Sequence, residues 1–289
     1  MKIAIIGGRG KMGQWMARFL QNEGEEVLIA DRNPAISTDI SQIAGKLLAS
    51  NREALEQADA IILSVPLDAV EEVSREISPV VKSGHVIIDI SSVKGFTLTA
   101  LHRHIKKGTL LGVHPMFGPG ADGLAGRSVV LTPEDQAGEE LAGKARQYLE
   151  GKGAKVKIMS PAEHDEIMSV VLGLAHFIAL ASADALLELG KLTESRQSAG
   201  TTYGLLLTYA ESVINEDPAL YSSLQKYLPG AAAVERVFLR KAGEWLSMVE
   251  QKDGEQLTRR MNGLKEGFRQ ADPRFGQAYR DMYRLLDRR

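Results

Sequence analysis

The chain has 289 residues, which favours two domains or one large α/β unit and is long enough for a sizeable hydrophobic core. Its 35 basic and 37 acidic residues are interspersed and leave a net charge of −2, which argues against nucleic acid or an anionic membrane as a partner. Cysteine is absent, so disulfides, thiolate nucleophiles and thiolate metal sites are excluded.

The first residues, MKIAIIGGRG, contain an apolar run that is too short for a signal peptide. No stretch approaches about 20 uncharged apolar residues, so we expect no transmembrane span. These features predict a soluble, cytoplasmic protein.

The chain opens with a strand and a glycine-rich turn. Residues 2–6, KIAII, are a short β-branched run, and Gly8, Gly10 and Gly13 follow with the spacing G-x-G-x-x-G. Residues 12–20 then have the pattern of an amphipathic helix. In dinucleotide-binding folds such glycines form the tight turn, admit the pyrophosphate and pack the helix against the strand. The helix N-terminus faces the phosphates. The order strand, turn, helix therefore predicts a dinucleotide site.

A second strand at residues 27–30 is followed by Asp31, about 20 residues beyond Gly13. A carboxylate at this point accepts the ribose hydroxyls of NAD and repels a 2′-phosphate, whereas Arg32 could accommodate the phosphate of NADP. We therefore predict NAD, with NADP as the alternative. The predicted cofactor-binding residues are Gly8, Arg9, Gly10, Met12, Gly13, Asp31, Arg32, Ser64 and Pro66.

Strands and helices alternate through the rest of the first half. Further strands are expected at residues 60–65, 85–90, 110–114, 128–132 and 154–159. Helices are expected at residues 67–81, 96–105 and 139–151. This rhythm predicts a doubly wound, Rossmann-type α/β domain over residues 1–160.

The stretch LLGVHPMFGPG, residues 110–120, has the pattern of a buried strand end followed by a loop. Pro115 disfavours a helical backbone at His114, which keeps the imidazole on the extended strand. In open α/β sheets the carboxyl ends of the strands form the ligand crevice, and histidine has a pKa suited to proton transfer near neutrality. His114 is therefore a candidate base, and a histidine merely hydrogen-bonded in a loop is the alternative.

The pattern becomes helical from Ser160 onward. Ser160, Pro161 and Glu163 form a capping box, and a long helix broken near Gly190 is expected to follow. Apolar residues between 168 and 187 are too widely spread for a one-sided surface helix, so we expect burial, including burial against a partner subunit.

Several further helices are expected in the second half, which predicts an all-helical domain over residues 161–289. They are separated at Asp217–Pro218, Pro229–Gly230, Asp253–Gly254 and Asp272–Pro273.

No metal site is predicted. Asp165 and His176 lie about three turns apart on one face of the long helix, too far to share an ion. By itself His176 is best explained as a core histidine. The remaining histidines are expected at strand edges, on the surface or at a helix start, and we assign no function to His85, His102, His104 and His164.

Three strings stand in one order behind the dinucleotide fold: DISSVK at residues 89–94, VHPMFGP at 113–119, and EHD at 163–165 followed by His176. This set resembles the prephenate dehydrogenases, and most closely the dehydrogenase part of the enterobacterial chorismate mutase–prephenate dehydrogenase. The likeness covers nearly the whole chain. The HPMFGP and SVK strings together are far more specific than the glycines.

The resemblance implies NAD-dependent oxidative decarboxylation of prephenate, a small dicarboxylate, to 4-hydroxyphenylpyruvate in tyrosine biosynthesis. Hydride would leave the ring carbon that bears the hydroxyl, and the ring would lose carbon dioxide as it becomes aromatic. His114 matches the family histidine that accepts the hydroxyl proton, and Ser92 matches a serine hydrogen-bonded to both. Lys94 matches a lysine that helps to hold the substrate anion, and His176 matches a histidine that lines the substrate pocket. The helical domain would form a homodimer.

Two departures from the family pattern bear on the substrate. The family arginine that clamps a carboxylate falls on Gly204, and a glycine cannot make that contact. Arg196, Arg236 or Arg240 could take its place. Some members also carry an acidic residue where Gly120 stands.

Other activities therefore stay open. The same chemistry on arogenate or 4-amino-4-deoxyprephenate is one alternative, and a non-catalytic dinucleotide-binding regulator is another. Intact Ser92, Lys94 and His114 favour an enzyme, because a sensor has no need of a proton acceptor.

Overall fold

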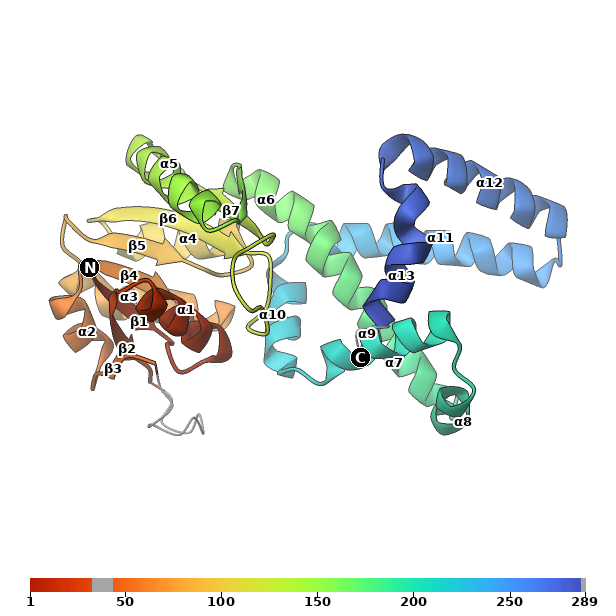
Figure 1. The fold of residues 1–289 in the computed structure, drawn as a ribbon, viewed down its shortest axis with the longest axis horizontal. Coiled ribbons are helices and arrows are strands. Elements are labelled where there is room, and N and C mark those ends of the chain that lie inside the picture. The colour runs from red at the N-terminus through yellow and green to blue at the C-terminus, as the bar shows by residue number, and fades with distance from the viewer. Residues whose placement is uncertain (33–43, 287–289) are drawn as a thin grey trace. The chain divides into compact units, whose positions relative to one another are not determined.

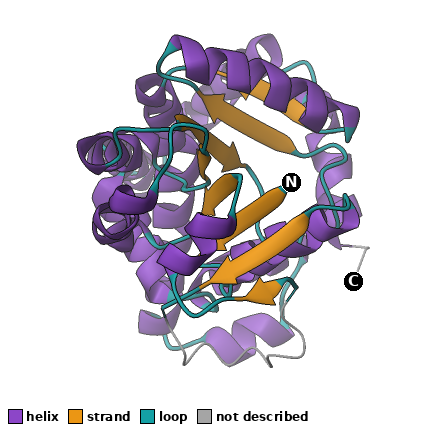
Figure 2. Ribbon diagram, turned by 90° about the vertical axis from the view of Figure 1, so that its left-hand side faces the viewer, coloured by secondary structure: helices purple, strands orange, loops and turns teal. Residues whose placement is uncertain are grey.

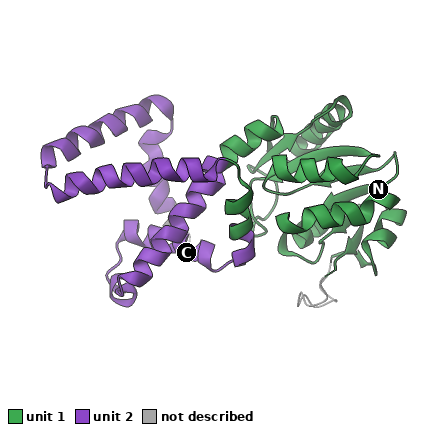
Figure 3. Cartoon of the chain, turned by 180° about the vertical axis from the view of Figure 1, so that it is seen from behind, with its two compact units in different colours: residues 1–168, 222–229 green, residues 169–221, 230–289 purple. Residues whose placement is uncertain are grey.

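The computed structural model describes residues 1–32 and 44–286. The chain forms two compact units, which Figure 3 shows in different colours. The first comprises Met1–Met168 with Ser222–Pro229, and the second comprises Ser169–Tyr221 and the chain from Gly230 onward. The sequence prediction drew one boundary between residues 160 and 161. The structure instead groups the first two turns of the long helix, and a later segment, with the first unit.

Within the described residues the first unit contains one eight-stranded sheet with the order β3-β2-β1-β4-β5-β6-β7-β8 (Figures 1 and 2). Its strands are β1 (Lys2–Ile6), β2 (Glu26–Ala30), β3 (Lys46–Leu47), β4 (Ala60–Leu63), β5 (Val86–Asp89), β6 (Thr109–Pro115), β7 (Ser128–Thr132) and β8 (Lys155–Ile158). All neighbours are parallel except β6 and β7. The order reverses between β1 and β4, where doubly wound sheets hold their ligands. The predicted α/β class is therefore confirmed.

Helices cover both faces of this sheet (Figure 2). Those with residues in the first unit are α1 (Lys11–Asn22), α2 (Asn51–Gln57), α3 (Val70–Ile77), α4 (Lys94–His104), α5 (Gln136–Gly151), α6 (Pro161–Met168) and α10 (Pro218–Tyr227). The helix predicted at 67–81 is shorter than expected, because 3₁₀ turns at Leu67–Ala69 and Ser78–Val80 flank α3. Sequence analysis missed α2 and β3, which are short.

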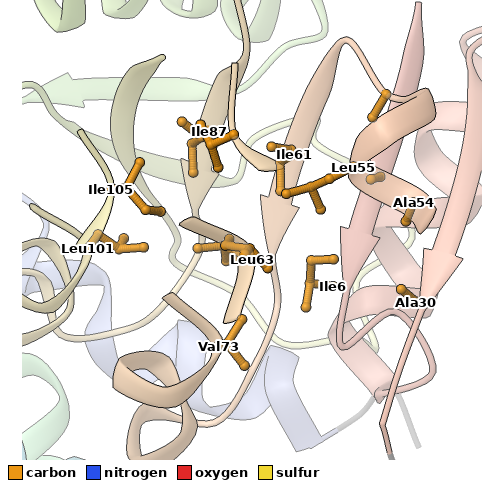
Figure 4. Packing of buried hydrophobic residues seen from close by; sticks show 14 of the residues in the cluster. Ile6, Ala30, Ala54, Leu55, Ile61, Leu63, Val73, Ile87, Leu101 and Ile105 are labelled. Atoms are coloured by element: carbon orange, nitrogen blue, oxygen red, sulfur yellow. The ribbon is translucent and has the colours of Figure 1, made fainter. Parts of the chain in front are cut away.

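Alternate residues of each strand build two hydrophobic layers. Ile6 of β1 packs in one cluster with side chains of α2, α3 and α4, and Figure 4 shows this layer. Ile5 faces the opposite cluster, which contains Trp15 of α1 and Ala142 of α5. Because both faces are buried, the strands are continuously apolar rather than alternating.

The second unit is helical throughout its described residues. It contains a π-helical segment (Ser169–Leu174), α7 (Ala175–Glu188), α8 (Leu192–Gln197), α9 (Thr201–Ile214), α11 (Ala231–Glu250), α12 (Gly254–Ala271), a 3₁₀ turn (Phe275–Gln277) and α13 (Ala278–Leu286). The four predicted breaks all fall at helix ends. The predicted Ser160 cap is also present, since Ser160 Oγ accepts a hydrogen bond from the Glu163 amide at 3.2 Å.

One continuous helix of 28 residues runs from Pro161 to Glu188 and ends before Gly190, which has a left-handed φ of 62°. It is long and apolar enough to cross a membrane on length and composition alone, so the expectation that no segment would be was wrong. Core helices of soluble proteins pass the same test. Only 11% of its most apolar stretch is buried inside the chain, which leaves a large apolar surface for another partner.

Gly13 and Gly143 provide a matched test of the packing at the glycine turn. An added Cβ at Gly13 would lie 2.6 Å from the Gly7 carbonyl oxygen, whereas one at Gly143 in α5 meets nothing within 4 Å. We expect Gly13→Ala to lower the free energy of unfolding by about 1–3 kcal/mol. Gly143→Ala should raise it by up to about 1 kcal/mol. Urea unfolding checks both values, and equal effects of the two substitutions would contradict the packing described here.

Candidate active site

The glycine turn joins the end of β1 to the start of α1. Gly10 is the N-cap of α1, and it makes no side-chain cap hydrogen bond, so the helix N-terminus is suited to an anion. An added Cβ at Gly8 would lie 2.8 Å from Ile29 Cδ1, and one at Gly10 comes no closer than 3.4 Å to another atom. The turn therefore needs glycine at position 8 for packing and leaves position 10 open to a ligand.

Gly7 is a further requirement that sequence analysis missed. Its φ is +75°, and an added Cβ would lie 2.3 Å from the carbonyl oxygen of Ser64. The Ser64 amide in turn donates to Ile6 O at 2.9 Å, which holds the ends of β1 and β4 together. Met12, Ser64 and Pro66 thus belong to the same carboxyl edge of the sheet. The glycine doublet in the sequence was the available signal.

The end of β2 forms a pocket of about 520 Å³ with β3 and α2. Three predicted cofactor residues, Arg9, Asp31 and Arg32, line it together. The Arg9 amide donates to Asp31 Oδ2 at 3.1 Å, which fixes the carboxylate beside the glycine turn. The glycine turn, the N-terminus of α1 and this pocket fit a dinucleotide.

Arg32 is already engaged by carboxylates of α3. Its guanidinium donates to both oxygens of Glu72, and Nη1 lies 3.9 Å from Glu76 Oε2. Hydrogen bonding to Glu72 raises the pKa of Arg32 above its ordinary value. The arginine that could receive a 2′-phosphate therefore already has an anionic partner.

His114 lies near the end of β6, opposite Val130 of β7, and is only 4% exposed. Its Nδ1 lies 2.8 Å from Nε2 of His164, and the two rings meet edge to face. Burial, the Lys94 ammonium and the second imidazole hold the pKa of His114 well below 6.5. This environment favours the neutral form of the imidazole, which can accept a proton.

His164 and Asp165 continue from this ring along α6. His164 is fully buried, and its Nδ1 lies 2.7 Å from Asp165 Oδ1. The two oxygens of Asp165 also accept the backbone amides of Lys94 and Gly95, each at 2.8 Å, at the start of α4. Sequence analysis allowed His164 a place at a helix start, where α6 has it, and assigned no function to it. The adjacent His–Asp pair in the EHD string was the signal it passed over.

Lys94 is fully buried, and its ammonium donates to the Asp89 carboxylate at 2.7 Å and to the carbonyls of Asp89 and Val113 at 2.8 Å. Gly112 makes room for it, because an added Cβ there would lie 3.1 Å from Lys94 Cδ. Burial lowers the pKa of Lys94, and Asp89 opposes this shift. With its hydrogens so engaged, the ammonium links the ends of β5 and β6, and its expected part in holding the substrate anion stays a prediction.

The two serines before α4 differ in their surroundings. Ser91 Oγ is held by Asp89 Oδ2 at 2.7 Å and by Thr97 Oγ1 at 3.0 Å. Ser92 is half-buried, and among the described residues its hydroxyl has no hydrogen-bond partner. Ser92 therefore keeps a hydroxyl that a ligand could use, as the sequence analysis expected of it.

His176 and Gly204 belong to the second unit. His176 on α7 packs edge to face on Tyr221, with ring centroids 4.6 Å apart, and burial lowers its pKa. Its Nδ1 is buried and has no hydrogen-bond partner among the described residues. Gly204 lines a pocket of about 900 Å³ together with Arg196, and Arg196 is paired with Glu211.

The fold and the glycine cradle define a two-domain dinucleotide-binding protein with a helical second domain. A family model described as the nucleotide-binding domain of prephenate dehydrogenase matches residues 16–158, and one described as its dimerization domain matches residues 160–263. The chain belongs to the prephenate dehydrogenase family. The cradle and this family together identify NAD as the cofactor.

Relatives agree on the family but differ in substrate. The chain is 33% identical over 272 residues to a probable arogenate/prephenate dehydrogenase of Methanocaldococcus jannaschii, covering 93% of this chain and 61% of the relative. It is 28% identical over 264 residues to a 4-amino-4-deoxyprephenate dehydrogenase of Streptomyces pristinaespiralis, covering 88% and 86%. The chain thus spans about three fifths of the archaeal relative's length.

Solved structures share the fold. A prephenate dehydrogenase from A. aeolicus, determined with hydroxyphenyl propionate and NAD⁺, superimposes with a TM-score of 0.74 at 22% identity. The match covers 94% of this chain and 98% of that one. At this identity the comparison supports the arrangement of the elements.

Proposed function

We propose that this chain is an NAD-dependent dehydrogenase that oxidatively decarboxylates prephenate to 4-hydroxyphenylpyruvate in tyrosine biosynthesis. The observation that carries the proposal is the buried His114 at the carboxyl end of β6, in a chain of this family. Ligands of doubly wound sheets bind at that edge. A neutral imidazole there is suited to remove a hydroxyl proton.

The residues of the chain would divide the work as follows. His114 accepts the proton of the ring hydroxyl, and the free hydroxyl of Ser92 hydrogen-bonds the same oxygen. His176 belongs to the second unit, and its Nδ1 has no hydrogen-bond partner among the described residues, which suits the substrate-binding role that the resemblance implies. NAD, when bound, supplies the acceptor for the hydride.

The related substrates differ from prephenate at different places: arogenate has an amino group on its side chain, and 4-amino-4-deoxyprephenate has one in place of the ring hydroxyl. Arogenate and 4-amino-4-deoxyprephenate undergo the same ring chemistry, and relatives of this chain bear both names. Gly204, where the family arginine was expected, supports keeping them as alternatives. A non-catalytic dinucleotide-binding regulator is the alternative to an enzyme.

Replacing the base tests the proposal directly. We expect His114→Asn to lower kcat by about 10²–10⁴, because a general base contributes an effect of this size. Affinity for NAD should hardly change, since the glycine turn and Asp31 lie on other strands. NADH absorbance measured with prephenate, arogenate and 4-amino-4-deoxyprephenate gives both the activity and the substrate.

The control for this experiment is Val130→Ala, which alters the buried neighbour of His114 across the ladder without removing a titratable group. Turnover near the wild-type value in His114→Asn would refute the role of the imidazole. No turnover of the wild type with any of the three compounds would favour the regulator.

We propose further that the site prefers NAD to NADP. Asp31 lies in the pocket beside the glycine turn, and Glu72 and Glu76 draw the Arg32 guanidinium toward α3. In the part of the pocket that the structure describes, a 2′-phosphate would approach these three carboxylates, and the Arg32 guanidinium is already paired with two of them.

Glu72 and Glu76, which pair with Arg32, can be compared with the neighbouring Glu71 to test the preference for NAD over NADP. We expect Glu72→Gln combined with Glu76→Gln to lower KM for NADP, because Arg32 loses both anionic partners. Asp31→Ala should narrow the preference for NAD over NADP by weakening the binding of NAD. Glu71→Gln is the control, since Glu71 pairs with Arg103 and His104 instead. A wild type that prefers NADP would contradict the proposal.

We also propose that the chain is a homodimer through its helical unit. Large apolar side chains of this unit are exposed in the single chain, among them Val170, Val171, Leu187, Leu189, Val237, Leu246 and Val249. Residues 160–263 match a dimerization domain model, and α7 to α9 leave an apolar pocket of about 900 Å³. A second copy would cover this surface.

Leu187 and Ile158 give a matched pair for the dimer. Leu187 lines the pocket on α7 and is 68% exposed, whereas Ile158 is 43% exposed on the edge strand β8. Light scattering at micromolar concentration should find a dimer for the wild type and for Ile158→Glu. Leu187→Glu should shift the protein toward monomer. A monomeric wild type would rule out the homodimer.

A further inference from the structure

We propose that His164 and Asp165 form a proton relay behind His114. In this relay Nε2 of His114 is the base, and Nδ1 of His114 passes its hydrogen to His164. The catalytic part of this inference rests on the proposed function. Three buried side chains in series carry it, with distances of 2.8 Å from His114 Nδ1 to His164 Nε2 and 2.7 Å from His164 Nδ1 to Asp165 Oδ1.

The directions of these hydrogen bonds follow from the far end of the series. The amides of Lys94 and Gly95 can only donate, so both oxygens of Asp165 are acceptors. Nδ1 of His164 must then donate its hydrogen to Asp165. In the neutral ring this leaves Nε2 of His164 as an acceptor, which requires the hydrogen of His114 to lie on Nδ1. The lone pair of His114 is therefore on Nε2.

The transfer leaves the number of protons unchanged. The hydroxyl O–H bond of the substrate breaks as an N–H bond forms at Nε2 of His114. The Nδ1–H of His114 can then move to Nε2 of His164, which places the positive charge on the ring beside the Asp165 carboxylate. The proton returns by the same route when the product oxygen takes it back. No other reactant is needed.

The surrounding charges explain why such a relay is useful at this position. The titratable groups packed around His114 are Lys94 with Asp89, and His164 with Asp165. Lys94 and burial both disfavour a positive charge on His114, and its pKa is accordingly lowered. Moving the charge to His164 places it next to the anion of Asp165 instead. His164 and Asp165 are thus positioning residues, because neither touches the reacting atoms.

A closed ring of interactions fixes this geometry. Asp165 accepts the amide of Lys94, and the ammonium of the same Lys94 donates to the carbonyl of Val113, which precedes His114. Asp165 therefore also holds the start of α4, so its substitution would disturb folding. His164 is the cleaner position to change.

The hydrogen positions can be measured without turnover. In protein labelled with ¹⁵N-histidine, we expect His114 and His164 to carry their hydrogens on Nδ1, with assignments from His114→Gln and His164→Gln. His164→Leu should abolish the single Nδ1–H form of His114, whereas His164→Gln should keep it, because the amide oxygen still accepts. A hydrogen on Nε2 of His114 in the wild type would overturn the relay, whether or not the enzyme turns over prephenate.

Kinetics test the transfer itself. We expect His164→Gln to lower kcat about 10-fold and His164→Leu about 100-fold. In His164→Leu the acidic limb of the kcat profile, where protonation inactivates the base, should move to lower pH, because the charged His114 ring loses its acceptor in a buried site. A purely structural role would lower the melting temperature and kcat together without moving this limb.

The control is His102→Gln, an exposed histidine of α4 paired with Glu134, which should leave kcat, its pH profile and the melting temperature unchanged. Wild-type kcat and pH profile in His164→Leu, with His114→Asn inactive, would refute the relay and leave the proposed function intact.

Discussion

The carboxylate of Asp165 is the interaction on which the arrangement of the site depends. It binds two backbone amides at the start of α4 and the imidazole of His164 at once. An anion at a helix N-terminus is stabilised by unpaired amides and by the helix dipole. Asp165 therefore joins α6 to α4 and sets the position of the imidazole that contacts His114.

Lys94 is the second residue that holds His114 in place. Its ammonium and the Asp89 carboxylate are both buried, so each depends on the other, and removing one partner of such a pair typically costs about 3–5 kcal/mol. The ammonium also holds the carbonyl before His114. Burial and the nearby Lys94 lower the pKa of His114, while His164 and Asp165 behind it offer a place for the proton.

Much of the fold followed from the sequence because its signals are local. The β-branched runs, the glycine turn and the Pro and Gly breaks each act within a few residues, so strands β1 and β7 were predicted to the residue. The contacts of His164 and Lys94 were missed because they depend on residues about 20 to 70 positions away, which no local pattern encodes. The apolar helix was expected to be buried, including against a partner subunit, and only 11% of its most apolar stretch is buried inside the single chain.

The central claim is that Nε2 of His114 takes the proton of the substrate hydroxyl. The most direct test is a crystal structure of this protein with NAD and hydroxyphenyl propionate bound. The account predicts Nε2 of His114 within about 2.6–3.2 Å of the ring hydroxyl, with Nδ1 still on His164. A hydroxyl bound away from His114, or an imidazole turned so that Nδ1 faces the ligand, would contradict it.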